Sequence, residues 1–369
     1  MKNILVFFGG QSVEHDVSIL TGVMATNLID KDKFNAIPIY ISRDGVWYTG
    51  KNLLDLDEYK KLNLKNLTKV VLLPGQNILF SLKGNRLKNI LEISVALNCM
   101  HGERGEDGCL AGLLNLCKIP LASPDIMPSS VCMDKTFTKI ALKGLNIKTL
   151  KSITVFSADE IEEVKRQFAY PLIVKPNKSG SSIGVNIAKD DSELYSSINY
   201  ALRFGECVII EPCLENFIEI NCSAYMDSTG EIIVSECERP VGRTKLLSFN
   251  DKYEGGKRIF PADIDNKYSK LIKKTTKLIY QKFSFSGVIR IDYFITENKV
   301  LVNEINTVPG SLAYYLFGDT LTGFTKMLNQ IIDNALKNYA KSLTTQKTFK
   351  TSILSFSGAK GVKHLKKLK

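Results

Sequence analysis

Apolar runs near the start of the chain predict a parallel sheet. Residues Asn3–Phe8 form a continuous apolar run, Val17–Ile29 has the spacing of a helix, and Phe34–Ile41 is a second run. A strand, a helix and a strand in this order form a βαβ unit with parallel strands. Ile93–Asn98 is a further buried strand. We therefore expect the chain to begin with an α/β domain.

From about residue 151 the apolar runs are shorter, which predicts a different architecture. Residues 66–89 are ambiguous and favour a hairpin that turns at Gly84-Asn85. The other expected strands are Ile153–Phe156, Leu172–Lys175, Val208–Glu211, Ile218–Tyr225 and Glu231–Cys237. The other expected helices are Cys109–Cys117, Met127–Leu145 with an end at Gly144, Ala158–Phe168, Asn266–Phe283 and Gly323–Tyr339. We expect three domains, at residues 1–120, 121–210 and 211–369.

The segment Gly287–Gly310 alternates between apolar and polar positions and predicts a hairpin. Arg290 and Asp292 lie two apart on its first strand, and Glu304 and Asn306 lie two apart on its second, so each pair shares a face. If a short turn joins the strands, one cation and three oxygen ligands meet on one exposed face. Carboxylate and amide oxygens suit Mg²⁺. The alternative is a hairpin with an ordinary solvated polar face.

Composition is that of a globular enzyme, with 369 residues, 44% hydrophobic and 24% charged. The formal net charge is +11, and the last residues, 359–369, add a lysine-rich cluster. This charge indicates either a solvated tail or a general attraction for anionic nucleotides. No basic stripe is interleaved with aromatic residues, so we expect no nucleic-acid partner.

Cysteine and histidine usage argues against a zinc or iron–sulfur site. The chain has eight cysteines without a CxxC pair, and three histidines. Free thiols indicate a reducing compartment, so we expect a cytoplasmic protein. The first apolar run is too short for a signal peptide, and no stretch reaches the ~18 apolar residues of a membrane span.

The segment from Lys175 to Gly184 reads strand, Gly/Ser turn, strand. It differs from a Walker A loop because the lysine precedes the turn and no helix follows. Backbone N–H groups and hydroxyls in such a turn can cover phosphates, and Lys175 can reach a phosphate oxygen. The alternative is a mobile hairpin tip.

Two glutamates near strand ends add to the hypothesis of a nucleotide site. Glu211 ends an apolar strand whose edge can read an adenine, and Glu219 in the next strand can hold ribose hydroxyls. Either could instead be an ordinary surface glutamate. Arg290 beside the candidate metal ligands can neutralise charge on a phosphoryl group or an oxyanion, and the N–H of Gly310 can serve as a second oxyanion donor.

Together these residues resemble the ATP-grasp superfamily. Lys175 before its Gly-Ser-Ser turn, Glu211, RIDYF and NEINTVPG occur in the order of that nucleotide site. The motifs GGQSVEHDVS, MHGERGEDG, MDKTFTK and NDKY narrow the resemblance to the D-alanine–D-alanine ligase family, from Asn3 to about Tyr339. The resemblance implies an N-terminal parallel-sheet domain and a two-part ATP-grasp domain of α+β character. It also implies the ligation of two D-alanine molecules with ATP, and a homodimer without membrane or nucleic-acid partners.

The resemblance further implies roles for individual residues. The residues expected at ATP are Lys135, Lys175, Ser182, Glu211, Glu219 and Lys252, the last meeting the γ-phosphate when a lid closes. Two Mg²⁺ (or Mn²⁺) ions are expected at Asp292, Glu304 and Asn306. The tetrahedral intermediate is expected to be stabilised by Arg290 and the Gly310 N–H.

For the first D-alanine, the resemblance assigns its ammonium to Glu14, and His101 helps to neutralise its carboxylate. Ser181 and Tyr253 are expected to hydrogen-bond to each other and to Glu14. Tyr253 and Lys252 fall in residues 239–260, a long glycine-bearing segment without a clear period, which is typical of a functional lid.

The sequence departs from the family pattern after NTVPG. The serine that grips the second substrate's carboxylate in the family falls at Tyr315, and Ser311 is another candidate for that role. Either Tyr315 donates its hydroxyl to the substrate, or Tyr314 and Tyr315 both pack under the closing helix. The departure leaves two alternatives to the synthesis of D-alanyl-D-alanine. One is a ligase with another second substrate, such as D-serine, D-lactate or another amine. The other is a nucleotide-binding protein without turnover.

Overall fold

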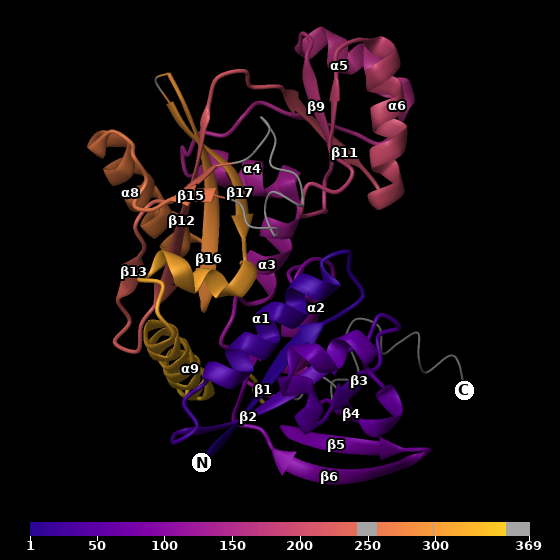
Figure 1. The fold of residues 1–369 in the computed structure, drawn as a ribbon, viewed down its shortest axis with the longest axis vertical. Helices are drawn as coiled ribbons and strands as arrows, with labels where there is room; N and C mark the ends of the chain where they lie inside the picture. Colours follow the sequence, from indigo (N-terminus) through magenta and orange to yellow (C-terminus); the bar gives the residue numbers. More distant parts are fainter. Residues whose placement is uncertain (242–256, 298, 352–369) are drawn as a thin grey trace. The chain divides into compact units, whose positions relative to one another are not determined.

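A computed structural model describes residues 1–241, 257–297 and 299–351 (Figure 1). Residues 1–336 form one compact unit and residues 337–369 a second. The division into three domains at residues 1–120, 121–210 and 211–369 remains a prediction. Most of the expected lid, with Lys252 and Tyr253, lies outside the described residues, as does the lysine-rich cluster at 359–369. In the described part of the chain, no helix is long and apolar enough to cross a membrane.

The N-terminal sheet has seven strands in the order β6-β5-β4-β3-β2-β1-β7. Its strands are β1 Lys2–Gly9, β2 Phe34–Ile41, β3 Trp47–Thr49, β4 Thr68–Leu72, β5 Ile78–Lys83, β6 Arg86–Glu92 and β7 Val95–Asn98. The expected βαβ unit is confirmed, because β1 pairs in parallel with β2 and β7, and α1 (His15–Leu28) connects β1 to β2.

The remaining strands make this sheet a mixed one, which is parallel only where β1 pairs with β2 and β7. From β2 to β6 each neighbouring pair is antiparallel. Only a short turn separates β2 from β3, and such a turn cannot make the crossover that parallel strands need. The hairpin of β5 and β6 turns at Gly84-Asn85, as predicted.

Two four-stranded antiparallel sheets follow, with strand orders β10-β9-β11-β8 and β13-β12-β16-β17. Their strands are β8 Ile153–Val155, β9 Leu172–Pro176, β10 Asn186–Ala188, β11 Val208–Pro212, β12 Ile218–Met226, β13 Ile232–Val234, β16 Val288–Thr296 and β17 Lys299–Asn306. Strands β14 Arg239–Val241 and β15 Lys257–Ile259 pair with each other.

Helices α5 and α6 lie beside the first of these sheets and α8 covers one face of the second (Figure 1). The helices after α1 are α2 Cys109–Leu116, α3 Ile126–Met133, α4 Lys135–Gly144, α5 Ile161–Gln167, α6 Asp191–Ala201, α8 Asn266–Lys282 and α9 Leu321–Leu343. The 3₁₀ turns are η1 Lys51–Leu54, η2 Leu56–Lys61, η3 Leu64–Asn66, η4 Ala158–Glu160, η5 Leu202–Phe204 and η6 Gly310–Leu316.

Two sequence predictions about these elements were wrong in detail. The single helix expected over Met127–Leu145 is two helices, α3 and α4, because Asp134 takes an extended conformation and its side chain caps α4 by accepting from the Phe137 N–H at 3.0 Å. The strand expected over Glu231–Cys237 is shorter, because the side-chain oxygen of Ser235 replaces a backbone partner for the Ser223 N–H at 2.9 Å.

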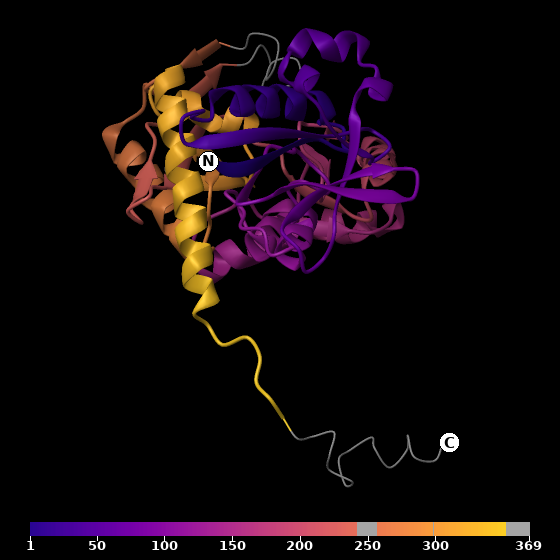
Figure 2. The same cartoon turned by 90° about the horizontal axis from the view of Figure 1, so that it is seen from below.

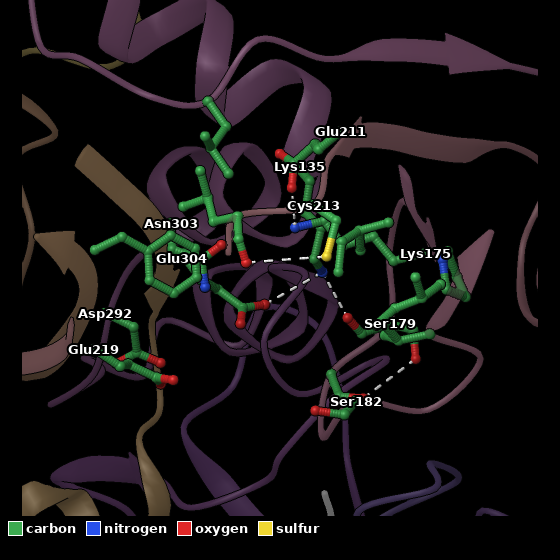
Figure 3. Close-up of a pocket in the computed structure, with 18 of the residues that line it drawn as sticks. Lys135, Lys175, Ser179, Ser182, Glu211, Cys213, Glu219, Asp292, Asn303 and Glu304 are labelled. Atoms are coloured by element: carbon green, nitrogen blue, oxygen red, sulfur yellow. Dashed lines mark hydrogen bonds and ion pairs between the residues drawn. The ribbon is translucent and has the colours of Figure 1, made fainter. Parts of the chain in front are cut away.

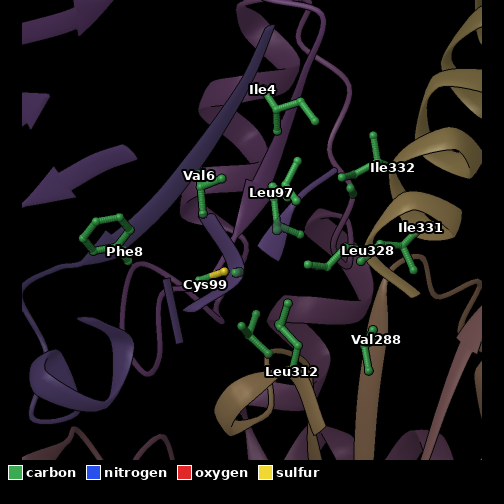
Figure 4. Packing of buried hydrophobic residues seen from close by; sticks show 14 of the residues in the cluster. Ile4, Val6, Phe8, Leu97, Cys99, Val288, Leu312, Leu328, Ile331 and Ile332 are labelled. Atoms are coloured by element: carbon green, nitrogen blue, oxygen red, sulfur yellow. The ribbon is translucent and has the colours of Figure 1, made fainter. Parts of the chain in front are cut away.

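One hydrophobic core joins the N-terminal sheet to elements from the end of the chain (Figure 4). It contains Ile4 of β1, Leu97 of β7, Leu312 of η6 and Leu328 of α9, each at most 2% exposed. In Figure 2 the first turns of α9 lie beside the end of α1, where Thr325 donates a 2.8 Å hydrogen bond to the carbonyl of Leu28. This shared core brings the ends of β7 and β17 together.

Candidate active site

The hairpin of β16 and β17 carries the predicted polar face. Arg290 stands opposite Asn306, and Asp292 stands opposite Glu304. The Asp292 carboxylate accepts hydrogen bonds from Arg290 Nε at 2.8 Å, Arg290 Nη2 at 3.1 Å and Asn306 Nδ2 at 3.1 Å. Asp292 is 3% exposed, so the expectation of an exposed face was wrong for this residue. Strand β12, which pairs along the other edge of β16, places it inside the sheet.

The donor set of this face suits a hard divalent cation. Two carboxylates and one amide oxygen are the groups that Mg²⁺ prefers. Each carboxylate already has a positively charged partner. Arg290 contacts Asp292, and Lys135 Nζ lies 3.2 Å from Glu304 Oε1. Among the described residues no group of three or more His, Cys, Asp and Glu side chains is placed to hold a metal ion. Any ion at this face would therefore depend on Asn306 and on substrate oxygens as further ligands.

A cavity next to this face is lined by residues of both small sheets (Figure 3). Lys135 extends into this cavity from α4 and donates a 2.6 Å hydrogen bond to the carbonyl of Ser179. Its Nζ also forms the ion pair with Glu304 inside the cavity. Apolar side chains form much of the wall: Leu150, Ile173, Val185, Ile187, Leu214, Phe217 and Phe294. A cavity with apolar walls and lysines and carboxylates at one end can take a flat base and its phosphates.

The carboxylate of Glu211, which lines this cavity, contacts two lysines. Lys139 Nζ lies 2.5 Å from one of its oxygens and Lys175 Nζ lies 2.7 Å from the other. Burial raises the pKa of Glu211, but Lys175 and Lys139 together outweigh it and lower that pKa. Burial lowers the pKa of Lys139, and the charge of Glu211 offsets only part of that effect.

The sequence analysis did not single out Lys139. It lies four residues after Lys135 on α4, a spacing that puts both side chains on one face of the helix. The repeated lysine in MDKTFTK was the signal that could have found it.

The Gly/Ser turn contacts the N-terminal domain through Glu14. The hydroxyl of Ser181 donates a short hydrogen bond to Glu14 Oε1, which is the predicted contact between these two residues. The approach of the backbone is so close that a Cβ on Gly180 would lie 2.8 Å from Glu14 Oε2. A larger residue here would push the Glu14 carboxylate away, so glycine lets the turn and the carboxylate approach this closely.

His101 is buried at the end of the segment that follows β7. Burial lowers its pKa to about 4, so its ring is neutral near pH 7. A neutral ring can offer a hydrogen bond but not the positive charge implied for neutralising a carboxylate. Its Nε2 lies 2.9 Å from Thr21 Oγ1, and that hydroxyl also accepts from the Ser311 N–H at 3.0 Å.

Glu106 is a second residue that the sequence analysis missed. Its carboxylate accepts from the Gly102 N–H at 2.8 Å and from the Val308 N–H at 2.9 Å, and so joins the segments after β7 and β17. Burial and the charge of Glu14 raise the pKa of Glu106 to about 8, against the lowering effect of the two N–H donors. The second glutamate of the motif MHGERGEDG was the available signal.

Glu106 predicts a pH dependence of stability. Its pKa is raised on folding from an ordinary 4.5 to about 8, so the folded state binds the proton more tightly. Its contribution to the free energy of unfolding is then full below pH 4.5 and is lost as the pH rises to about 8. We expect the stability difference between wild type and Glu106→Gln to change steadily over this range in urea unfolding. A difference that stays constant with pH would contradict the assignment.

The segment after Pro309 makes a left-handed turn. Ser311, Leu312 and Ala313 have φ of 51°, 49° and 49°, which is uncommon without glycine and costs about 1–2 kcal/mol per residue. The hydrogen bond from the Ser311 N–H to Thr21 Oγ1 and a 2.8 Å bond from the Leu312 N–H to the Pro309 carbonyl hold the turn. Burial of Leu312 and Ala313 in the shared core offsets the strain.

The two tyrosines that follow have different surroundings. Tyr314 stacks on Phe324 of α9 with ring centroids 4.8 Å apart, so it packs under the closing helix. The hydroxyl of Tyr315 accepts a long 3.5 Å contact from Arg290 Nη1, and the guanidinium of Arg258 lies 5.0 Å from its ring centre. Burial raises the pKa of Tyr315, so the hydroxyl keeps its proton and can donate it.

Sequence-distant residues meet at one small cavity. Its lining includes Glu14, Lys135, Ser181, Arg290, Glu304 and Asn306. The neighbouring cavities contain Lys175, Ser182, Glu211 and Glu219 on one side, and Gly310, Ser311 and Tyr315 on the other. The structure thus brings together the predicted site residues that it describes, apart from His101, which lies beneath Thr21.

Comparisons with known proteins agree with this arrangement. Residues 3–124 match the family described as D-ala D-ala ligase N-terminus, and residues 138–336 match D-ala D-ala ligase C-terminus. The chain is 36% identical over 351 residues to the D-alanine–D-alanine ligase of Thermosipho africanus, covering 91% of this chain and 92% of that protein.

Two solved structures are similar along most of their length. The D-alanine–D-alanine ligase of Helicobacter pylori has a TM-score of 0.74 and 29% identity, covering 94% of this chain and 100% of that one. The VanG D-Ala:D-Ser ligase of Enterococcus faecalis has a TM-score of 0.77 and 28% identity, covering 90% and 99%.

Proposed function

Because this chain belongs to the D-alanine–D-alanine ligase family, we propose that it joins two D-alanine molecules with ATP through a D-alanyl phosphate. The products are D-alanyl-D-alanine, ADP and phosphate, and the dipeptide serves peptidoglycan precursor synthesis. The observation that carries the proposal is the small cavity lined at once by Glu14, Ser181, Arg290 and Glu304. This lining supports the proposal, because a carboxylate that could take an ammonium lies in the same cavity as an arginine and a glutamate suited to phosphoryl and acyl transfer.

The chemistry explains why these groups must be neighbours. A carboxylate is a poor acyl donor, so one carboxylate oxygen of the first D-alanine attacks the γ-phosphorus of ATP and ADP leaves. The amine of the second D-alanine then attacks the carbonyl carbon. The C–N bond forms, the C–O bond to phosphate breaks, and the protons of the ammonium pass to phosphate and solvent. Positioning and electrostatic stabilisation account for most of such catalysis.

Each described residue then has one role in this scheme. Glu14, hydrogen-bonded to Ser181, takes the ammonium of the first D-alanine. The neutral ring of His101, whose Nε2 is hydrogen-bonded to Thr21, offers a hydrogen bond to the carboxylate of that substrate. Arg290 and the Gly310 N–H stabilise the oxyanion of the tetrahedral intermediate. The cavity beside them takes ATP, with Lys135, Lys175 and Ser182 at the phosphates and Glu211 and Glu219 toward adenine and ribose.

Two Mg²⁺ or Mn²⁺ ions are proposed at Asp292, Glu304 and Asn306. When bound, these ions would neutralise charge on the phosphates of ATP. The support is the hard oxygen donor set on one face of the hairpin. Lys135 now contacts Glu304, and we expect it to turn to the phosphates when nucleotide binds.

A related ligase with another second substrate is the alternative. Tyr315 stands at the second-substrate side of Arg290, where the family pattern has a smaller serine, and a D-Ala:D-Ser ligase is among the similar structures. A screen of ATP-dependent phosphate release across D-amino acids and D-hydroxy acids, with product masses, tests both. We expect D-alanine alone to release phosphate and give the dipeptide. Release only with a second compound would favour the alternative, and no release with any pair would favour a nucleotide-binding protein without turnover.

The remaining proposals concern assembly and location. We propose a homodimer in the cytoplasm, without nucleic-acid or membrane partners. The support for the location is that several cysteines, among them Cys99, Cys117 and Cys222, are free thiols buried as small core residues. Light scattering with size-exclusion chromatography tests the dimer, and a mass of about 41.2 kDa, that of one chain, would contradict it.

A further inference from the structure

A row of polar side chains crosses the sheet next to the catalytic hairpin. Asn221 of β12 stands opposite Asp292 of β16 on one side and opposite Glu238 on the other. Asp292 in turn stands opposite Glu304 of β17. Directly opposed residues in antiparallel strands share a face, so these four side chains form one row. The metal-site proposal uses Asp292 and Glu304, and leaves Asn221 and Glu238 without a role.

The side-chain oxygen of Asn221, Oδ1, is a hydrogen-bond acceptor to which no group in the described part of the chain donates. The residue is 7% exposed, and its Nδ2 donates a 3.2 Å hydrogen bond to Glu238 Oε2. Because an ionised carboxylate can only accept, this bond sets the orientation of the amide. Its Oδ1 then points away from Glu238 and has no hydrogen-bond partner among the described residues. A buried acceptor without a partner is rare in folded proteins and indicates a missing donor.

Asn221 lines a cavity of about 430 Å³ with Arg290, Gly310 and Tyr315. Among the described residues of its wall, the charged ones are four acids, Glu219, Glu238, Asp292 and Asp319, and three bases, Lys257, Arg258 and Arg290. Charges of both signs suit a ligand that carries an ammonium as well as a carboxylate. Arg290 and Gly310 mark the place of the acyl carbonyl, so the donor must be a group that approaches this carbonyl.

We propose that Asn221 Oδ1 accepts a hydrogen bond from the amino group of the second amino acid and aims its nitrogen at the acyl phosphate. This assignment rests on the proposed ligase function. The carboxylate of the same substrate then faces Tyr315, at the other side of Arg290. Asn221 then positions the attacking nitrogen of the second substrate.

An amide suits this position better than a carboxylate. The amine must lose a proton before its lone pair can attack, and a carboxylate in contact would hold that proton more tightly. An amide oxygen accepts a hydrogen bond from the ammonium and from the neutral amine alike. This hydrogen bond holds one N–H of the amine against Asn221 Oδ1, while the lone pair of the neutral amine faces the carbonyl.

The experiment compares Asn221→Ala and Asn221→Asp with the wild type. For Asn221→Ala we expect the KM of the second D-alanine to rise roughly 10- to 100-fold, the loss typical of a hydrogen bond to a charged group. The KM values of ATP and the first D-alanine should stay close to wild type. Inhibition by propionate, which has the carboxylate but neither an amine nor a hydroxyl, should be unchanged. For Asn221→Asp we expect the pH profile of kcat to shift to higher pH.

A matched control is Asn329→Ala on α9. Asn329 also donates to a carboxylate, Asp30 Oδ2 at 3.1 Å, and its Oδ1 likewise lacks a partner among the described residues. It lies by the end of α1, so its replacement should leave all KM values unchanged. Thermal unfolding of each variant separates a folding defect from a binding defect.

Three outcomes would overturn the assignment. One is an unchanged second-substrate KM in Asn221→Ala, and another is an equal loss of affinity for propionate. The third is a higher Mg²⁺ requirement with the second-substrate KM intact, which would place Asn221 at the metal site. A wild type that makes no dipeptide would instead refute the proposed function itself, so the two failures are distinguishable.

Discussion

Glu304→Gln is expected to lower kcat by about 10³-fold or more while the protein remains folded. The carboxylate is a proposed ligand of the ions that neutralise the phosphates of ATP, a contribution of several kcal/mol at about 1.4 kcal/mol per decade. Glu304 is suited to this test because its side chain is 26% exposed and its partner Lys135 can find another anion. Phosphate release with saturating ATP and D-alanine measures the effect.

The control for this variant is Glu297→Gln, an exposed carboxylate at the tip of the same hairpin, which should keep full activity. Asp292→Asn is expected to abolish turnover too, but also to lower stability, because the partly buried Arg290 would lose the negative charge of its partner. Full activity of the wild type in EDTA, or of Glu304→Gln without it, would refute the metal assignment.

Tyr315→Phe is expected to raise the KM of the second substrate by roughly 10- to 150-fold. Loss of a hydrogen bond to a charged group costs about 1.5–3 kcal/mol, and each 1.4 kcal/mol is about one decade. The structure supports this expectation, because the hydroxyl of Tyr315 points to Arg290 and keeps its proton. The KM values of ATP and the first D-alanine should change little.

Tyr314→Phe provides the matched control, because its ring stacks on Phe324 and the change keeps that ring. It should leave the second-substrate KM unchanged. If Tyr315→Phe altered only the melting temperature, Tyr315 would be a packing residue. Recognition of the carboxylate would then fall to Ser311 or another group.

The hairpin of β16 and β17 shows how much a local sequence pattern can predict. The period of two in RIDYF and VNEIN placed Arg290, Asp292, Glu304 and Asn306 on one face, and the register confirms it, because side-chain alternation is a property of the strand itself. Burial is not such a property. Asp292 is buried because β12 pairs along the other edge of β16, and nothing within the hairpin encodes that neighbour.

The sequence by itself determined the strands, the α/β beginning of the chain and the segments that carry chemistry, because periodicity and short motifs are local. Only the tertiary structure decided which of these segments meet. Glu106 links Gly102 to Val308 across about two hundred residues, and Asn221 joins the row of Asp292 through strand pairing. The left-handed turn that directs Tyr315 toward Arg290 is stabilised by contacts with Thr21 and the shared core. Such contacts depend on packing between distant segments, and packing overrides local preference when the buried contacts outweigh the strain.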